Sequence, residues 1–331
     1  MATLLCLGVP AGATVGIDLK SWVIGERFQG ITGIPAGPHY LYYSAPDHGA
    51  GNAISSGRFL YFDANDDVWV GEWNPETEEI LPVSDRDQAL RYCHGVKAHD
   101  FTLNLGRYPE EMSLEWATLS LHISRSCMLR LSPIGSVIRP TQAPDAVGLN
   151  SDSACKTYYT ELEIGMSHGD PVQVTADNLD KSRLLEKVVE LRLGGDYDAV
   201  LGELQFAFIA FMLGQSYEGF VQWKKLVLIL CSCEAAMWDQ RLFFDKFVDL
   251  FSAQLRLAPE DFFECELTSN NFLYRALTDL FELGQETSLE DKLIRFRHQA
   301  EKKFHWRFGS QLNADGRFDS DDEDAPVIVE L

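Results

Sequence analysis

DAVLGELQFAFIAFML, residues 198–213, is the stretch that decides the fold of the second half of the chain. Its large apolar side chains are Leu201, Leu204, Phe206, Phe208, Ile209, Phe211 and Met212. A surface helix keeps one polar face, whereas a helix that is apolar nearly all round is buried on every side. We therefore expect a central core helix here. Gly214 ends it, and Ser216 can cap a second helix over residues 217–231.

Helical signals continue through the region after Asn178. Further helices are expected over residues 179–193, 235–255, 259–266, 270–283 and 288–307. The Gly194–Gly195 pair ends the first of these, and Thr287 with Glu290 has the spacing of a capping box before the last. The expected architecture of this region is an α-helical bundle or superhelix.

The first third of the chain has the pattern of a β domain, in which short apolar runs are separated by Gly, Pro and Asn. Strands are expected over residues 4–7, 29–34, 39–44, 58–63, 68–73 and 77–83. Asn65–Asp67 is typical of a tight turn, so the strands on either side of it are expected to form a hairpin. The fold class predicted from the residues is therefore α+β and multidomain, with the β part first.

Two helices are expected after these strands. The first begins at Ser84, which has Asp87 at capping-box spacing, and ends at Gly95. The second follows Pro109. Its apolar surface is expected to include Met112, Leu114, Trp116, Leu119 and Ile123.

Composition divides the chain into four parts. Residues 1–131 are expected to be the β-rich domain, and residues 177–308 the helical domain. Between them, residues 132–176 contain recurring Pro, Gly and Ser, which predicts a linker with one short strand near residues 158–164. Residues 309–331 form a tail with seven acidic residues and one base, Arg317, and we expect it to be disordered in isolation.

The charge of the chain limits its partners. With 28 Lys and Arg against 50 Asp and Glu among 331 residues, the formal net charge is −22. Nucleic-acid affinity depends on neutralising phosphates with basic side chains, so no direct nucleic-acid binding is expected. A basic protein partner fits this charge, and so does an acidity that only keeps the protein soluble.

The cysteines and the N-terminal residues indicate in which cellular compartment the protein is expected. The seven cysteines are scattered and include no C-x-x-C pair, which indicates reduced buried thiols in a cytosolic or nuclear protein. The N-terminus lacks the basic region of a signal peptide, and no apolar run reaches the roughly 20 residues that cross a bilayer. We expect a soluble protein in the cytoplasm and nucleus, with no membrane association.

No catalytic motif in the sequence has the context that its chemistry requires. No Lys follows Gly8, Gly12 and Gly16, so a strand–turn–strand is expected there in place of a phosphate loop. Ser153–Lys156 fits S-x-x-K but lies in the expected linker. A third set, Cys93, His94 and His99, lacks further ligands at a metal-site spacing, which favours a structural or surface role. The prediction is no catalytic residue, no metal and no cofactor; a hydrolase with an unrecognised site is the remote rival.

Two long blocks resemble a known family. They are GVPAGATVGIDLKSWVIGERFQGITGIPAGPHYLYYS, residues 8–44, and LGELQFAFIAFMLGQSYEGFVQWKKLVLILCSCEAAM, residues 201–237. A third, shorter segment, KKFHWRF at residues 302–308, supports them. Together they resemble the AAR-two family of splicing factors, and the resemblance spans most of residues 1–308.

The resemblance implies a fold and a function. The fold is a β-sandwich-like N-terminal domain joined to a helical, VHS-like superhelix domain. The implied function is a non-enzymatic assembly factor that binds the Prp-eight scaffold, through its RNase H-like and MPN-like domains, during biogenesis of the U5 and tri-small nuclear ribonucleoproteins. The alternative is a generic helical-repeat adaptor, because Leu213-Gly214 with Tyr217, Phe220 and Trp223 is similar to one tetratricopeptide hairpin.

The acidic tail contains the candidate functional residues. The apolar residues Val327, Ile328, Val329 and Leu331 form a β-prone segment after Pro326, which we expect to bind a partner by adding a strand to a sheet edge. The alternative is that this segment folds back onto the protein's own sheet. Ser320 precedes acids at residues 321–324 and is a phosphorylation candidate. The last helix, with a net charge of +3 over residues 287–308, can bind the tail, bind an acidic partner or be ordinary solvated surface.

Overall fold

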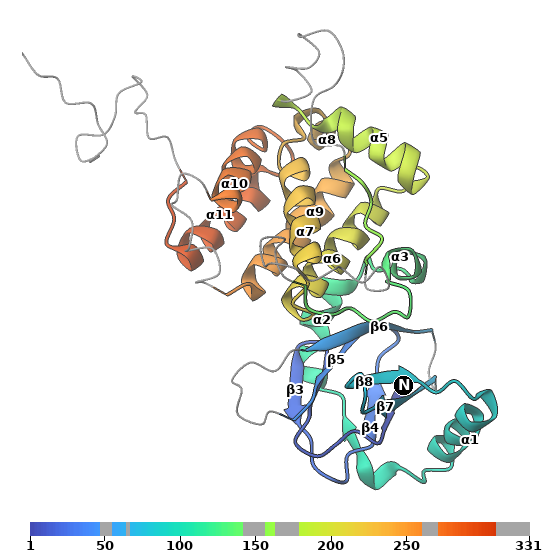
Figure 1. The fold of residues 1–331 in the computed structure, drawn as a ribbon. Helices are drawn as coiled ribbons and strands as arrows, with labels where there is room; N and C mark the ends of the chain where they lie inside the picture. The colour runs from blue at the N-terminus through green and yellow to red at the C-terminus, as the bar shows by residue number, and fades with distance from the viewer. Residues whose placement is uncertain (47–54, 64–66, 142–155, 163–178, 260–270, 309–331) are drawn as a thin grey trace, which may run out of the picture. The chain divides into compact units, whose positions relative to one another are not determined.

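The structure is a computed structural model that describes residues 1–46, 55–63, 67–141, 156–162, 179–259 and 271–308. Two compact units divide the chain, Met1–Ala258 and Pro259–Leu331. The first unit contains the described strands together with helices α1 to α9, and the second contains α10 and α11 (Figure 1).

The first unit contains two β-sheets. The first sheet has the order β8-β7-β1-β4-β9 and the second has the order β3-β2-β5-β6. In chain order the strands are β1 (Ala2–Leu7), β2 (Thr14–Ile17), β3 (Lys20–Val23), β4 (Gly30–Ile34), β5 (Gly37–Ser44), β6 (Ser56–Phe62), β7 (Val68–Asn74), β8 (Glu79–Pro82) and β9 (Leu105–Arg107). The second sheet is antiparallel throughout, whereas β1 pairs parallel to β7 and β4 parallel to β9 in the first. The two sheets pack face to face, which confirms the β-sandwich-like domain.

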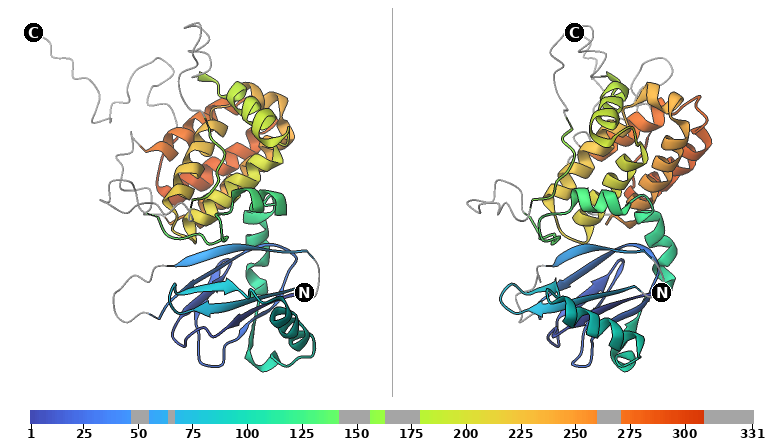
Figure 2. Two further views of the ribbon diagram at one scale, coloured as in Figure 1. Left: turned by 45° about the vertical axis from the view of Figure 1, so that its right-hand side comes forward. Right: turned by 90° about the vertical axis from the view of Figure 1, so that its right-hand side faces the viewer.

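Strands β5 and β6 of the second sheet are buried on both faces. Successive side chains of a strand point to opposite sides. In β5, Leu41 therefore enters the core between the sheets while Tyr40 enters a second core on the helical side. In β6, Leu60 likewise enters the core between the sheets, and Phe59 enters the core on the helical side. Figure 1 shows β5 and β6 on the side of the sandwich next to α2, and Figure 2 shows the same first unit from two further directions.

A stacked pair of aromatic rings joins this sheet to the helices. The ring of Phe59 lies 4.1 Å, centroid to centroid, from the ring of Phe206 on α6. Both side chains are buried, and the surrounding core includes Trp116, Ile138 and Ile209. The sandwich and the helices thus share one hydrophobic core within the first unit.

The helical part of the first unit is built around α6. Its helices are α2 (Ser113–Ser120), α3 (Arg125–Leu131), α5 (Ser182–Leu193), α6 (Asp198–Met212), α7 (Tyr217–Leu230), α8 (Glu234–Asp239) and α9 (Arg241–Leu257). Every residue of α6 from Val200 to Ala210 is buried, which confirms the central core helix. Ser216 caps α7 by accepting a hydrogen bond from the N–H of Gly219, as expected.

Gly214, between α6 and α7, permits the close approach of the helices to β5. A Cβ atom at this position would lie 2.4 Å from the hydroxyl of Tyr40 and 2.6 Å from the carbonyl oxygen of Ala210. No side chain fits there, so the Leu213-Gly214 pair is explained by packing of the hairpin against the sheet.

The second unit consists, in its described residues, of α10 (Phe272–Leu283), α11 (Glu290–Phe304) and the segment after α11. Aromatic rings hold that segment in place: Trp306 stacks on Phe304 at 4.8 Å between centroids, and Phe308 stacks on Tyr274 at 5.0 Å. KKFHWRF is therefore a packing motif that closes the two helices.

Several predictions about the strands were wrong. The expected hairpin around Asn65–Asp67 does not form, because β6 pairs with β5 in the second sheet whereas β7 pairs with β1 and β8 in the first. The chain therefore crosses between the sheets at this point. The strand–turn–strand expected near Gly8, Gly12 and Gly16 is formed by β1 and β2, whereas the short strands β3 and β9 were missed because KSWV and LGR contain no run of β-branched residues. Residues 158–162 contain no strand, and the rest of the strand expected there lies outside the described residues.

Several helix details also differ from the prediction. Asp85 caps α1 (Arg86–Lys97), in place of Ser84, because its carboxylate accepts from two N–H groups of the first turn. The expected helix over residues 235–255 is two helices, α8 and α9, separated at Gln240. Thr287 accepts from the N–H of Leu289, so the capping box with Glu290 is not formed.

Helix α2 is shorter than the apolar pattern suggested. Short 3-10 turns at Thr102–Asn104 and Glu110–Met112 precede it. Leu114 is 85% exposed, contrary to its expected place in the core, while Trp116, Leu119 and Ile123 are buried. Phe211, at the end of α6, is half-buried. The helix expected over residues 259–266 lies, but for Pro259, outside the described residues.

The expected linker contacts both halves of the first unit where it is described. Ile138 exchanges backbone hydrogen bonds with Gly57 of β6. Thr141 reaches α7, where its hydroxyl accepts from the N–H of Tyr217. The domain boundaries predicted at residues 131, 176 and 308 stay predictions. The two compact units of the structure meet at Ala258.

Truncating Phe206 to alanine tests the shared core. We expect Phe206→Ala to lower the free energy of unfolding by about 3–5 kcal/mol, because it removes a fully buried ring and leaves a cavity. Leu242→Ala is the matched control; its side chain is 82% exposed, and we expect a change within about 0.5 kcal/mol. Denaturant titration followed by circular dichroism measures both. Equal stabilities for the two variants would contradict a core at this position.

Candidate functional site

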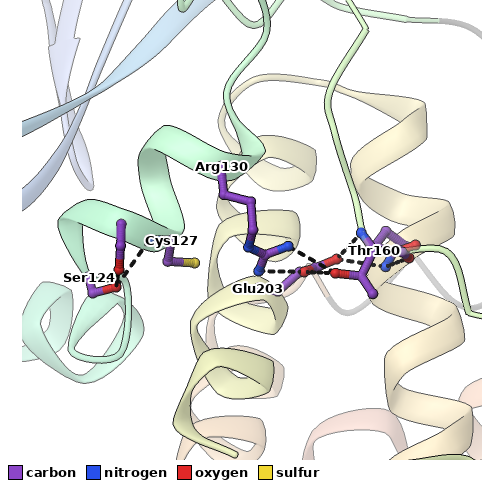
Figure 3. A network of polar contacts seen from close by, with 7 residues as sticks. Ser124, Cys127, Arg130, Thr160 and Glu203 are labelled. Carbon is purple, nitrogen blue, oxygen red and sulfur yellow. Dashed lines mark hydrogen bonds and ion pairs between the residues drawn. The ribbon is translucent and has the colours of Figure 1, made fainter. Parts of the chain in front are cut away.

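A buried carboxylate on α6 organises a polar cluster that joins separate elements of the first unit (Figure 3). Glu203 is 1% exposed and accepts four hydrogen bonds. Its Oε1 accepts from the N–H of Thr160 at 2.7 Å and from Nε2 of Gln222 at 2.9 Å. Its Oε2 accepts from the hydroxyl of Thr160 at 2.7 Å and from Nη2 of Arg130 at 2.9 Å. We call Arg130, Thr160, Glu203 and Gln222 the Glu203 cluster.

The Glu203 cluster connects three helices to one extended segment. Arg130 comes from α3, Glu203 from α6 and Gln222 from α7, whereas Thr160 belongs to residues 156–162. Gln222 also donates to the carbonyl oxygen of Thr160 at 2.9 Å. The backbone of Thr160 is thus bound at both its N–H and its C=O, as in a β-ladder, but by side chains.

The carboxylate of Glu203 has no lone pair left to accept a further hydrogen bond. A carboxylate offers about four lone-pair sites, and each oxygen of Glu203 already receives two donors. A general base must be able to accept a proton from a substrate. The chemistry of the cluster is therefore the fixing of residues 156–162 on the helices.

A second buried polar cluster lies in the sandwich. Asp18 accepts from the hydroxyl of Tyr108 at 2.7 Å and from the N–H of Tyr40 at 2.8 Å, and it lies 2.7 Å from Nδ1 of His39. The Nε2 of His39 is 3.0 Å from the carbonyl oxygen of Pro35, which can only accept, so that nitrogen carries a hydrogen. Both ring nitrogens are engaged, and His39 is 2% exposed. This histidine ties the strands together.

The cysteines lie mostly in the protein interior. All five in the described residues are free thiols, and four of them are buried. Burial raises the pKa of Cys6 and of Cys127 to about 12, which keeps both as thiols at neutral pH. Reactive cysteines require a lowered pKa and access. These two residues fit the structural role that the sequence predicted.

The remaining sites considered from the sequence do not assemble in the described residues. No group of three or more His, Cys, Asp or Glu side chains there could hold a metal ion. Cys93 lies 4.0 Å from the carbonyl oxygen of Val68. A hollow of about 540 Å³ is lined by Gly8, Pro10, Trp73 and Glu78 among others, and Glu78 is the one ionisable residue among the described residues that line it. None of the described helices has the length and hydropathy needed to cross a membrane.

The residues predicted to act in the tail lie outside the described residues. These are Ser320, Val327, Ile328, Val329 and Leu331, and Ser153 of the S-x-x-K match is also outside. Sequence reasoning missed the Glu203 cluster. A signal was present, since Glu203 and Gln205 are polar residues in an otherwise apolar helix and must find buried partners.

These observations define a class of protein: a two-part scaffold in which a β-sandwich and a helical layer share a core and buried polar groups hold chain segments in place. Comparison with known proteins supplies the family. The sequence model of the AAR2 N-terminal domain matches residues 1–133, and that of the AAR2 C-terminal repeat region matches residues 160–309.

Full-length relatives agree with the domain matches. The Protein AAR2 homolog of Mus musculus is 30% identical over 370 aligned residues, covering 100% of this chain and 94% of that protein. The Homo sapiens homolog is 29% identical, with the same coverage of both chains. The A1 cistron-splicing factor AAR2 of Saccharomyces cerevisiae is 22% identical, covering 99% of this chain and 98% of the yeast protein.

The chain therefore belongs to the AAR2 family of splicing factors, the AAR-two family that its two blocks resemble. The family resemblance predicted from the sequence is confirmed. The yeast relative is named as a factor, and the matches indicate no catalytic family.

Replacing Glu203 tests the cluster. We expect Glu203→Ala to lower the free energy of unfolding by about 3–5 kcal/mol, because the guanidinium of Arg130 and the N–H of Thr160 lose a buried partner. Hydrogen exchange at the Thr160 amide should accelerate in parallel. Glu190→Ala, at an exposed position of α5, is the control and should be near neutral. Unchanged exchange at Thr160 in Glu203→Ala would show that the cluster does not hold residues 156–162.

Proposed function

We propose that this protein is a non-enzymatic assembly factor in pre-mRNA splicing that binds the Prp-eight scaffold protein during biogenesis of the U5 and tri-small nuclear ribonucleoproteins. The observation that supports this most is family membership over the full chain, together with the name of the yeast relative, A1 cistron-splicing factor AAR2. The proposed contacts are with the RNase H-like and MPN-like domains of the scaffold. The factor acts in the cytoplasm and in the nucleus, and it holds its partner without binding nucleic acid directly.

The charge of the chain supports a protein partner. At a formal net charge of −22 the chain repels a phosphate backbone, whereas an RNA-binding scaffold must offer basic surfaces. An acidic factor that covers such a surface competes with RNA for it. This gives the assembly role a physical basis: the scaffold is kept from RNA until the factor leaves.

The tail is the proposed contact element. An isolated five-residue strand is not stable by itself, so Val327–Leu331 needs a sheet edge on which to pair. Pro326 has no N–H to donate and sets where pairing begins. Val327 and Val329 would then point to one face and Ile328 to the other. Main-chain hydrogen bonds to the partner's edge strand would supply affinity, and pockets for these side chains would supply specificity.

Deleting Pro326–Leu331 tests the contact. We expect an unchanged melting temperature and a complex with the recombinant RNase H-like and MPN-like domains that is weaker by about tenfold or more, which corresponds to about 1.4 kcal/mol. Isothermal titration calorimetry measures the affinity. The control replaces Gln311–Ala314 with Gly and Ser, which changes the tail but keeps its end. A lowered melting temperature would favour fold-back onto the protein's own sheet, and an unchanged affinity would reject the strand contact.

Ser320 is the proposed regulatory residue. Acids at residues 321–324 suit a kinase with a basic substrate groove, and a phosphate adds about −1.5 to −2 charges next to the strand segment. We expect the phosphorylated chain to bind its partner more weakly than the unmodified chain, with Ser320→Ala resistant to the kinase. Mass spectrometry of the purified protein measures the modification of Ser320. A repeat of the calorimetric titration measures the affinity for the partner. Equal affinities before and after complete modification would reject the role.

The rival function is a generic helical-repeat adaptor. It is favoured by the packed α6–α7 hairpin and by the description of the matching family segment as a repeat region. Mass spectrometry of proteins that co-purify with the tagged full-length chain separates the two functions. We expect U5 proteins with the scaffold as the main partner, and a set of unrelated proteins without them would favour the adaptor. The chain without Pro326–Leu331 serves as the matched sample.

A further inference from the structure

Helix α11 presents a basic stripe to solvent. Arg295, His298 and Lys302 are exposed and follow one another at spacings of three and four residues, which places them along one face of the helix. Asp291 lies one turn before Arg295 on the same side. We call Arg295, His298 and Lys302 the α11 stripe. It belongs to a segment with a net charge of +3 in a chain whose total is −22.

Arg297, Lys303 and, within the stripe, His298 interact with neighbouring groups of the same helix. Arg297 pairs with Glu301 at 3.0 Å, and the ammonium of Lys303 lies over the ring of Phe304. Within the part of the chain that the structure describes, no carboxylate pairs with Arg295 or Lys302. The opposite face of α11 is buried through Leu293, Phe296, Ala300 and Phe304, so the stripe is the face left to meet a ligand.

The structure fixes the point from which the tail leaves. His305 adopts a left-handed conformation with φ of 56°, which turns the chain out of α11. Phe308 then packs on Tyr274, and its N–H donates to Oε1 of Glu301 at 3.2 Å. The tail therefore starts at a fixed position next to the C-terminal half of α11.

Charge and reach both suit the tail as the occupant of the stripe. Residues 309–331 contain seven acidic residues and one base, and the acids at 319 and 321–324 are the densest run. Asp319 is eleven residues beyond Phe308, so the chain between them can span at most about 36 Å. The stripe itself is about 10 Å long at 1.5 Å per residue. A short tether of this kind gives an effective concentration on the order of millimolar.

We propose that the acidic run Asp319–Asp324 docks in cis on the α11 stripe. The carboxylates meet the guanidinium of Arg295 and the ammonium of Lys302 as charge-assisted hydrogen bonds. The contact is exposed and weak per pair, and it depends on the tether for its occupancy. It places Val327–Leu331 beside the second unit in the free protein.

This contact gives the proposed tail function an autoinhibitory state, and that consequence rests on the proposed function. A docked tail must leave α11 before Val327–Leu331 can pair with a partner's sheet edge. A phosphate on Ser320 would strengthen the docked state, because it adds charge next to the acidic run. Loss of the stripe should therefore increase partner affinity by severalfold, whereas deletion of Pro326–Leu331 should decrease it.

Trypsin cleavage at Arg317 in the full-length chain tests the docking without any partner. Arg317 is the one tryptic site within residues 309–331, and docking of the adjacent acids protects it. We expect Arg295→Glu with Lys302→Glu to accelerate cleavage at Arg317 by roughly tenfold at low salt. In 1 M salt, where the Debye length is about 3 Å, parent and variant should converge.

The matched control is Lys187→Glu with Arg192→Glu on α5, which makes the same change in net charge at two exposed positions of the first unit. It should leave the cleavage rate unchanged. Zero-length carbodiimide coupling adds a second readout, and we expect Lys302 to be linked to a carboxylate of residues 319–324 with a yield independent of protein concentration. Equal cleavage rates in parent and stripe variant, equal acceleration by the control, or a link that grows with concentration would each overturn cis docking. A normal docking result with an unaffected partner complex would instead reject only the autoinhibitory step.

Discussion

The burial of β5 and β6 on both faces is the constraint on which the first unit depends. One face of β5 and β6 packs on the first sheet and the other on α6, through Phe59 and Phe206. An antiparallel sheet commonly leaves one face to water. Here neither half can be removed without exposing apolar rings, so the sandwich and the helical layer are expected to unfold as one cooperative unit. The absence of any side chain at Gly214 follows from the same close approach.

Buried polar groups hold in place the strands and segments that pack on this apolar core. Asp18 holds His39, Tyr40 and Tyr108 within the sandwich, and Glu203 holds an extended segment on the helices. A buried carboxylate is costly unless its lone pairs are satisfied, and satisfied networks favour one arrangement over others. Both acids sit in the two blocks by which the family resemblance was found. Their partners, however, lie as many as 90 residues away in sequence.

Local sequence signals therefore predicted only the features that depend on residues close together in the chain. The core helix α6, the cap at Ser216 and six of the strands follow from periodicity and turn residues close in sequence. The route of the chain from β6 to β7 does not, because a short polar turn is compatible both with a hairpin and with a crossing between sheets. The Glu203 cluster was out of reach for a related reason. Nothing in the local sequence around Thr160 indicates that its partners are on α3, α6 and α7. The tail candidates lie outside the described residues, so the structure leaves them as predictions.

Anchoring Thr160 to Glu203 also changes the entropy of the long connection between Thr141 and Leu179. With residues 156–162 bound, the chain between Thr141 and Leu179 is divided into two spans, 142–155 and 163–178, and both ends of each span belong to the first unit. Loop closure entropy grows only slowly with length, by about 0.6 kcal/mol for each doubling. Insertions in either span are therefore expected to cost little closure entropy. A change in the length of one span leaves the anchored ends of the other in place, so the two spans are expected to tolerate insertions independently.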